Sequence, residues 1–363
     1  MNKVVRRLVL TGTALALTLG ASACGGGEQG AAGGGDEGQA GKIGILLPES
    51  KTARYEAFDR PLMEKKLKQL CPQCEILYQN ADQDAAKQQQ QAESMLTQGV
   101  KVLILDAVDA KAAGGIVTSA KQQGVAVVAY DRLATGPVDY YVSFDNHKVG
   151  QVQGQTLLEA LGDDRASGQI VMINGAPTDP NAAEFKAGAE SVLKGEVEIG
   201  RSYDTPDWSP DKAQQEMEQA ITALGKDNII GVYAANDGTA SGAIAAMKAA
   251  GFANNVPVTG QDAELAAIQR IVADEQYMTV YKAIKPEADA AAEMAVALLQ
   301  GKKYDKATAT KNNGSKDVPS VLLEPVAVTK DNIKETVVAD GFWSVDEICT
   351  ARYADACAKA GLR

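Results

Sequence analysis

The feature that most constrains the fold is a regular alternation of short apolar runs and amphipathic stretches that begins at Lys42. A short apolar run is consistent with a buried parallel strand, and apolar residues at intervals of three and four indicate a helix. Strands that alternate with helices predict an α/β fold of parallel sheets with right-handed crossovers. The predicted strands cover 42–47, 75–78, 100–106, 125–131, 169–174, 197–203, 229–236 and 257–260, and the predicted helices cover 54–70, 84–98, 110–123, 182–193, 211–224, 238–250 and 265–272.

An internal repeat indicates that the chain forms two similar lobes. Segments 109–116 and 237–244 share the spacing of Asp, Gly and Ile, and each follows a predicted strand and opens a predicted helix. Each helix then leads to a strand that ends in an aspartate, Asp131 or Asp262. The chain beyond residue 41 is also longer than one compact core usually supports, which favours two lobes as well.

Residues 1–23 have the pattern of an export signal peptide. Basic residues Arg6 and Arg7 precede an apolar run, 8–19, and small residues stand before Cys24. The apolar run is too short to span a bilayer as a permanent helix. We therefore expect the folded part of the protein to lie outside the cytoplasm.

Cys24, at the expected cleavage point, is followed by a low-complexity stretch that continues to residue 41. This arrangement resembles a bacterial lipoprotein signal, so we expect residues 24–41 to be a lipidated cysteine and a flexible Gly-rich tether to the outer face of the cell membrane. Lipoprotein signals usually carry Leu three residues before the cysteine, where this chain has Ala21. Residues 21–23 also suit ordinary signal peptidase, which would release a periplasmic protein.

Composition excludes several functional classes. The net charge of −11 and the pI near 4.8 argue against nucleic acid as a partner and against charge-driven membrane binding. The lipid is then the only membrane contact that we expect. The single histidine, His147, and the lack of metal-ligand and nucleophile motifs predict no metal, no cofactor and no enzymatic activity. The first strand leads into residues 48–51 without a Gly-rich motif, which argues against a dinucleotide-binding site. A glycosidase is the enzyme that the residues leave open, because a carboxylate pair such as Asp131 and Asp262 could in principle hydrolyse glycosides.

Four cysteines remain beyond Cys24, an even number in an oxidising compartment. They allow three connectivities. We expect the local pairing, Cys71–Cys74 and Cys349–Cys357. A redox role for Cys71 and Cys74 is less favoured, because they follow a predicted helix, whereas a reactive pair of this spacing lies at a helix N-terminus.

Polar residues gather where the predicted strands end, and ligands of open parallel sheets bind beyond those ends. The residues at these positions are Asp131, Arg132, Asn236, Asp237, Asp262 and Lys282. Carboxylates, amides and cations in this arrangement suit a polyhydroxyl ligand, because each hydroxyl both donates and accepts hydrogen bonds. Tyr55 and Trp208 are candidates for packing on the C–H face of a sugar, since Trp208 lies in a loop with no evident core to join.

Each of these residues also has a simpler interpretation. Asp237 could cap the helix that begins at Gly238. Asp131 and Arg132 could form a surface ion pair, and Lys282 could be a solvated charge. Tyr55 and Trp208 could be half-buried packing residues.

The chain resembles the D-xylose-binding proteins, which are the sugar-capture subunits of bacterial ABC importers of the ribose/galactose type. The resemblance rests on segments 130–132, 143–150, 260–262, 278–282 and 312–320. It implies two Rossmann-like lobes with parallel sheets, joined by a three-strand hinge, that close on one monosaccharide. The N-terminal lobe would be 42–146 plus 281–323 and the C-terminal lobe 147–280 plus 324–347, with a Cys-containing tail, 348–363, that has no assigned role.

The resemblance also implies a site and a function. Tyr55 and Trp208 would enclose the sugar; Tyr55 stands where the best-known member of the family has Trp. The expected partners of the hydroxyl groups are Arg54, Arg132, Asp179, Asn181, Asn236, Asp237, Asp262 and Lys282.

We expect a monomer that captures D-xylose and delivers it to an ABC permease. The alternatives are another sugar, such as glucose, arabinose or ribose, and a sensor that presents its ligand to a chemoreceptor or sensor kinase. The effector domain of a transcriptional repressor would share the fold, but it would begin with a helix-turn-helix rather than with a leader.

Overall fold

The computed structural model describes residues 40–252 and 256–362. The predicted signal peptide, the lipidation of Cys24 and most of the Gly-rich tether lie outside the described residues. No helix in the described part of the chain is long and apolar enough to cross a lipid bilayer.

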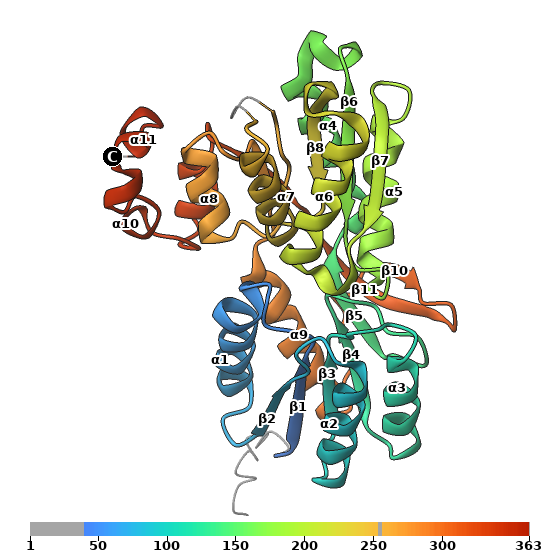
Figure 1. Cartoon of the computed structure of the whole chain (residues 1–363). Coiled ribbons are helices and arrows are strands. Elements are labelled where there is room, and N and C mark those ends of the chain that lie inside the picture. The colour runs from blue at the N-terminus through green and yellow to red at the C-terminus, as the bar shows by residue number, and fades with distance from the viewer. Residues whose placement is uncertain (1–39, 253–255, 363) are drawn as a thin grey trace, which may run out of the picture. The chain divides into compact units, whose positions relative to one another are not determined.

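A seven-stranded sheet carries the first half of the site (Figure 1). Its strands are parallel except for the β10–β11 hairpin at one edge. In spatial order they are β10 (Ala309–Asn312), β11 (Asp317–Leu323), β5 (Tyr140–Phe144), β4 (Ala126–Tyr130), β3 (Val102–Leu105), β1 (Lys42–Leu47) and β2 (Glu75–Asn80).

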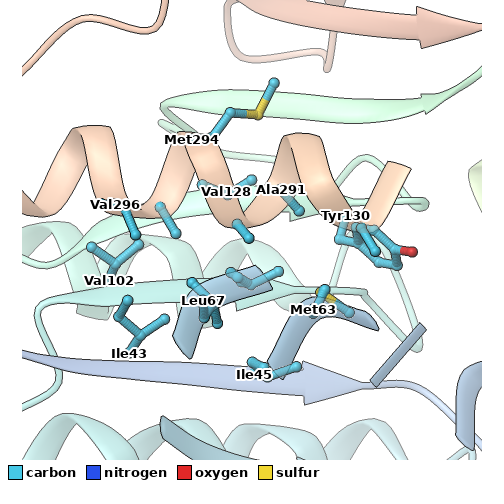
Figure 2. Close-up of a cluster of buried hydrophobic side chains, with 14 of the residues drawn as sticks. Ile43, Ile45, Met63, Leu67, Val102, Val128, Tyr130, Ala291, Met294 and Val296 are labelled. Atoms are coloured by element: carbon cyan, nitrogen blue, oxygen red, sulfur yellow. The ribbon is translucent and has the colours of Figure 1, made fainter. Parts of the chain in front are cut away.

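Helices cover both faces of this sheet because successive side chains of its apolar strands point to opposite faces. One face packs against α1 (Arg60–Leu70) and α9 (Ile284–Leu299), as the side chains in Figure 2 show, with Ile43 and Ile45 of β1 beneath Met63 and Leu67. The other face packs against α2 (Ala85–Thr97) and α3 (Ala113–Gln122). A short π-helical segment, η1 (Tyr55–Asp59), precedes α1.

A parallel three-stranded sheet carries the second half of the site. Its order is β7 (Glu198–Asp204), β6 (Gln169–Asn174), β8 (Ile229–Ala234). One face packs against α4 (Asn146–Leu161) and α5 (Pro180–Leu193), and the other against α6 (Pro210–Leu224) and α7 (Asp237–Ala249). Both sheets therefore have the helix-covered form that the alternating pattern predicted.

The predicted strand 257–260 is wrong. Val258 forms only an isolated bridge to Val232. The hydroxyl of Thr259 exchanges hydrogen bonds with the backbone N–H and C=O of Ala234 (2.9 and 3.0 Å), so a side chain takes the place of part of the ladder. The segment nevertheless runs beside β8 and brings Gln261 and Asp262 to the same edge.

The remaining elements form an antiparallel pair and a C-terminal helical segment. β9 (Met278–Tyr281) pairs with β12 (Val326–Thr329). α8 (Leu265–Val272) packs with η5 (Lys334–Val338), α10 (Val345–Ile348) and α11 (Ala354–Lys359) around one apolar cluster. The two disulfides pair as predicted, Cys71–Cys74 after α1 and Cys349–Cys357 between α10 and α11.

Candidate functional site

A small polar cavity lies where the strand ends of the two sheets meet. The residues that line it come from the loop after β1, from η1, from the ends of β4, β8 and β9, from the segment 257–262, from α5 and its N-cap and from the turn after β7. They are Thr52, Tyr55, Asp131, Arg132, Asp179, Asn181, Phe185, Trp208, Asn236, Gln261, Asp262 and Lys282. Eight of the ten residues predicted from the sequence are among them.

Arg54 and Asp237 are the two predicted residues that do not line the cavity. Arg54 lies one layer behind it, where it forms ion pairs with buried carboxylates. Asp237 is wholly buried and accepts hydrogen bonds from the side chains of Gln276 (2.8 Å) and Thr279 (3.0 Å). It does not cap α7 either, because the N-cap is Asn236, which forms a capping box with Thr239.

Four lining residues were not among the predicted site residues. Asp131 was named among the polar residues at the strand ends but not among the expected partners of the hydroxyl groups. Gln261 stands next to the predicted Asp262, so the strand-end pattern could have included it. Phe185 follows Asn181 by four residues, which is the helical spacing that places both on one face of α5. Thr52 lies in the loop after β1 and carries no sequence signal.

Asp131 and Asp262 make equivalent backbone contacts, with β5 and β9 respectively. The backbone N–H of Asp131 donates to Val142 O and that of Asp262 to Val280 O, both at 2.9 Å. Both have left-handed backbones, with φ of 53° and 93°. Such conformations cost a non-glycine residue about 1–3 kcal/mol and cluster at functional sites. The two segments of the internal repeat therefore lead to a matched pair of carboxylates in the cavity wall.

Arg54 fixes the Asp131 carboxylate from behind. Its guanidinium is 2.7 Å from Asp131, 2.6 Å from Asp59 and 2.7 Å from Glu287, all of them buried. Burial alone would raise the pKa of Asp131, but the charges of Arg54, Lys282 and Arg132 lower it below its ordinary value. Asp131 is therefore an ionised acceptor at the cavity wall.

Direct bonds join the two sides of the cavity. Asp131, at the end of β4, accepts from the side-chain amide of Asn181 on α5 (2.7 Å). Arg132 forms an ion pair with Asp179, the N-cap of α5 (2.9 Å), and donates to the Tyr55 hydroxyl (3.3 Å). The proposed surface pair between Asp131 and Arg132 is thus wrong, since both are buried and each pairs elsewhere.

Three aromatic residues line the cavity, Tyr55, Phe185 and Trp208. Trp208 is buried against Phe185, with ring centroids 6.4 Å apart and edge-to-face geometry, so its ring does join an apolar cluster. Its indole N–H donates to Asp179 (3.1 Å), which orients the ring. On the other side, Tyr55 is buried under the guanidinium groups of Arg54 and Arg132, 5.3 and 5.9 Å from its ring centroid.

The remaining wall combines a cation, a carboxylate and an amide. Lys282 pairs with Asp262 at 3.1 Å, and both are buried. The side-chain oxygen of Gln261 is buried and has no hydrogen-bond partner among the residues that the structure describes. The described residues contain no group of three or more His, Cys, Asp or Glu placed to hold a metal ion. The wall therefore offers donors and acceptors suited to hydroxyl groups.

Glu287 in the Arg54 cluster predicts a pH dependence of stability. Burial raises its pKa to about 8, against the lowering effect of Arg54. Between about pH 4.5 and 8 the Glu287 carboxyl group therefore stays protonated in the folded protein but is ionised in the unfolded chain. The contribution of Glu287 to the free energy of unfolding falls as the pH rises through this range. Between pH 5.5 and 8.5 the melting temperature of Glu287→Gln, measured by calorimetry, should fall less than that of the unaltered protein, by at least about 3 °C.

A matched control lies on the same helix. Glu293→Gln removes a carboxylate whose pKa is lowered, mainly by its bonds to Lys306 and Lys66 against the effect of burial, so it titrates below this pH window. It should leave the pH dependence unchanged. Equal pH slopes for Glu287→Gln and the unaltered protein would contradict the assignment.

Ligands of open α/β sheets bind in the crevice beyond the carboxyl ends of the strands, which is where this cavity lies. A family model described as "Periplasmic binding protein domain" matches residues 43–303. The D-xylose-binding periplasmic protein of Escherichia coli is 41% identical over 313 residues, which cover 85% of this chain and 92% of that protein. The chain belongs to the periplasmic binding protein family, as the resemblance implied.

Two further relatives extend this comparison. The multiple sugar-binding periplasmic receptor of Rhizobium radiobacter is 34% identical over 329 residues, which cover 85% of this chain and 92% of that protein. The crystal structure of an ABC transporter solute-binding protein from Clostridium phytofermentans with bound β-D-glucose has a TM-score of 0.78 and 31% identity, and covers 85% of this chain and 99% of that one. The predicted α/β class, with two parallel-sheet lobes, is confirmed.

Proposed function

We propose that this protein captures a monosaccharide, D-xylose, in the cavity and delivers it to an ABC permease. The observation that carries the proposal is the composition of the cavity wall, in which three aromatic residues and three ion-paired aspartates, Asp131, Asp179 and Asp262, surround one small space. The xylose-binding name of the relative that is 41% identical supports the choice of sugar.

The physical mechanism is closure around the ligand. The cavity wall comes from both sheets, so only the closed state offers a sugar every contact, and the sugar shifts the equilibrium toward that state. Micromolar affinity corresponds to about −8 kcal/mol. A few hydrogen bonds to charged groups, at about 1.5–3 kcal/mol each, and stacking can supply this after ordering costs.

The same wall favours holding a sugar over cleaving it. Each cavity aspartate is engaged by a cation: Asp131 by Arg54, Asp179 by Arg132 and Asp262 by Lys282. We infer a binding protein without catalytic activity.

The periplasmic names of the relatives support a place outside the cytoplasm. The anchor through Cys24, the monomeric state and the lobe boundaries at 146–147, 280–281 and 323–324 stay part of the proposal.

A thermal-shift series tests the specificity. A ligand that binds the folded state raises the melting temperature according to its concentration relative to Kd. Among xylose, glucose, arabinose, ribose and galactose at equal concentration, xylose should give the largest shift. A larger shift with glucose would keep the capture role and change the sugar.

Glucose is the second candidate because the solved relative from Clostridium phytofermentans, 31% identical, holds β-D-glucose. Tyr55 is the first residue to examine in that case, because a ring smaller than Trp leaves more room at this wall. A shift with none of the five sugars would favour a different ligand and a sensory role.

A further inference from the structure

The C-terminal segment, residues 334–362, has no role in the proposed capture of a sugar, yet it contacts the site from outside. Its centre is the pair Phe342 and Trp343, which pack in the same apolar cluster as α8 and the Cys349–Cys357 disulfide. Neither residue lines the cavity. Three of their contacts, however, are with residues close in sequence to cavity residues.

The first contact is with η1, which carries Tyr55. Phe342 stacks on Phe58, three residues after Tyr55, with ring centroids 4.0 Å apart and an interplanar angle of 18°. Trp343 meets the same Phe58 ring edge-on at 5.0 Å. Since η1 leads directly into α1 on the seven-stranded sheet, this packing joins the C-terminal segment to the Tyr55 side of the site.

The second contact is with the backbone that holds Asp262. The indole N–H of Trp343 donates to the carbonyl oxygen of Ala263 at 2.8 Å. Asp262 and Ala263 both have left-handed backbones, with φ of 93° and 50°. Two consecutive residues in this region are costly unless their surroundings fix them, and the Trp343 bond is one of the contacts that do so.

The third contact is with β9, whose last residue precedes Lys282. Tyr281 packs edge-to-face on Phe342 at 5.1 Å, and its hydroxyl donates to Asp340 at 3.1 Å. Phe342 and Trp343 thus contact the residues next to Asp262 and Lys282, and these two residues pair with each other in the cavity wall. They also contact the helical turn that carries Tyr55.

The segment is rigid enough to hold these contacts. Trp343 is followed by a capping box in which Ser344 and Glu347 bond reciprocally at the start of α10. Ile348, Cys349 and Cys357 are wholly buried against α8, and Gln269 of α8 donates to the backbone of Glu347 at 3.0 Å. The disulfide closes the loop between α10 and α11 and restricts its unfolding.

We propose that Phe342 and Trp343 are positioning residues of the sugar site, which set Tyr55 against the Asp262–Lys282 pair, and that the disulfide-closed C-terminal segment is the support that holds them. This inference rests on the proposed sugar-binding function. It assigns a role to a segment that the sequence left without one.

The test compares three single variants in the full-length protein, with xylose affinity measured by calorimetry well below each melting temperature. Phe342→Ala should weaken xylose binding about tenfold. Trp343→Phe keeps the ring but removes the bond to Ala263, and should weaken binding at least threefold. The matched control is Tyr353→Ala, because Tyr353 packs at the edge of the same apolar cluster, where its ring lies against the guanidinium group of Arg352. It should bind xylose as the unaltered protein does, even if its melting temperature falls.

A spectroscopic measurement separates positioning from a general effect on stability. The chain has two tryptophans, Trp208 and Trp343. In Trp208→Phe the emission therefore comes from Trp343, outside the cavity, and saturating xylose should shift or quench it.

Unchanged Trp343 emission in a protein that binds xylose, or equal affinities of Phe342→Ala and the control, would overturn the inference and leave the proposed function intact. Failure of the unaltered protein to bind any sugar would overturn both.

Discussion

Replacing Arg132 by methionine is expected to reduce the affinity for xylose at least 100-fold. Arg132 is buried, forms an ion pair with Asp179 at 2.9 Å and donates to Tyr55 at 3.3 Å. Burial opposes its charge, but Asp179, Tyr55, Asp106 and Glu49 raise the pKa of Arg132 well above its ordinary value, so it stays charged. A 100-fold loss is about 2.8 kcal/mol, which corresponds to one or two hydrogen bonds from a charged group.

Stability must be separated from affinity in this experiment. Removing one partner of a buried ion pair costs about 3–5 kcal/mol, and Arg132→Met leaves Asp179 and Asp106 without their cation. Arg132→Lys keeps the charge but loses the planar fork, and should weaken binding at least tenfold in a folded protein. Arg165→Met, which removes a partly exposed arginine paired with Glu196, is the control and should bind normally. Affinities of both Arg132 variants within threefold of the unaltered protein would exclude Arg132 from the site.

Replacing Trp208 by alanine is expected to weaken xylose binding at least tenfold while the protein stays folded by circular dichroism. The ring supplies one apolar wall of the cavity, and Asp179 holds its indole N–H at 3.1 Å. Removing it deletes the stacking surface and one of the bonds that orient Asp179. Calorimetry with xylose measures the loss, and an unchanged affinity would remove Trp208 from the site.

A second variant displaces the same ring without removing it. A Cβ on Gly175 would lie 2.0 Å from Cη2 of Trp208, so Gly175→Ala must push the indole out of place. It should lower the affinity at least tenfold as well. Gly115→Ala is the matched control, because the nearest atom to its new Cβ is the Gln89 Oε1 at 3.5 Å, an ordinary contact.

Local pattern was sufficient for most of the fold. The apolar runs and helical spacings predicted all three strands of the second sheet and the strands from β1 to β4, and the short sequence separation of Cys71 from Cys74 and of Cys349 from Cys357 favoured the observed disulfides. Strand-end polarity identified five of the twelve cavity residues, Asp131, Arg132, Asn236, Asp262 and Lys282, because parallel strands bring their carboxyl ends to one edge.

What the pattern missed depends on contacts between distant parts of the chain. β11 pairs with β5 across more than 170 residues, and neither was predicted as a strand. Arg54 was predicted to bind the sugar, but it forms an ion pair with Glu287, 233 residues away, and therefore lies behind the cavity wall. Asp237 was also predicted to bind the sugar, but its carboxylate accepts hydrogen bonds from Gln276 and Thr279, which the fold brings next to it.

Whether the cavity binds a monosaccharide is measured by isothermal titration calorimetry of the purified protein with D-xylose. One binding site per chain is expected, with a Kd of about 1 μM or lower, and a much weaker site in Arg132→Lys. Absence of heat with xylose, glucose, arabinose, ribose and galactose would contradict this expectation, because a cavity wall built for a monosaccharide would then hold none of them.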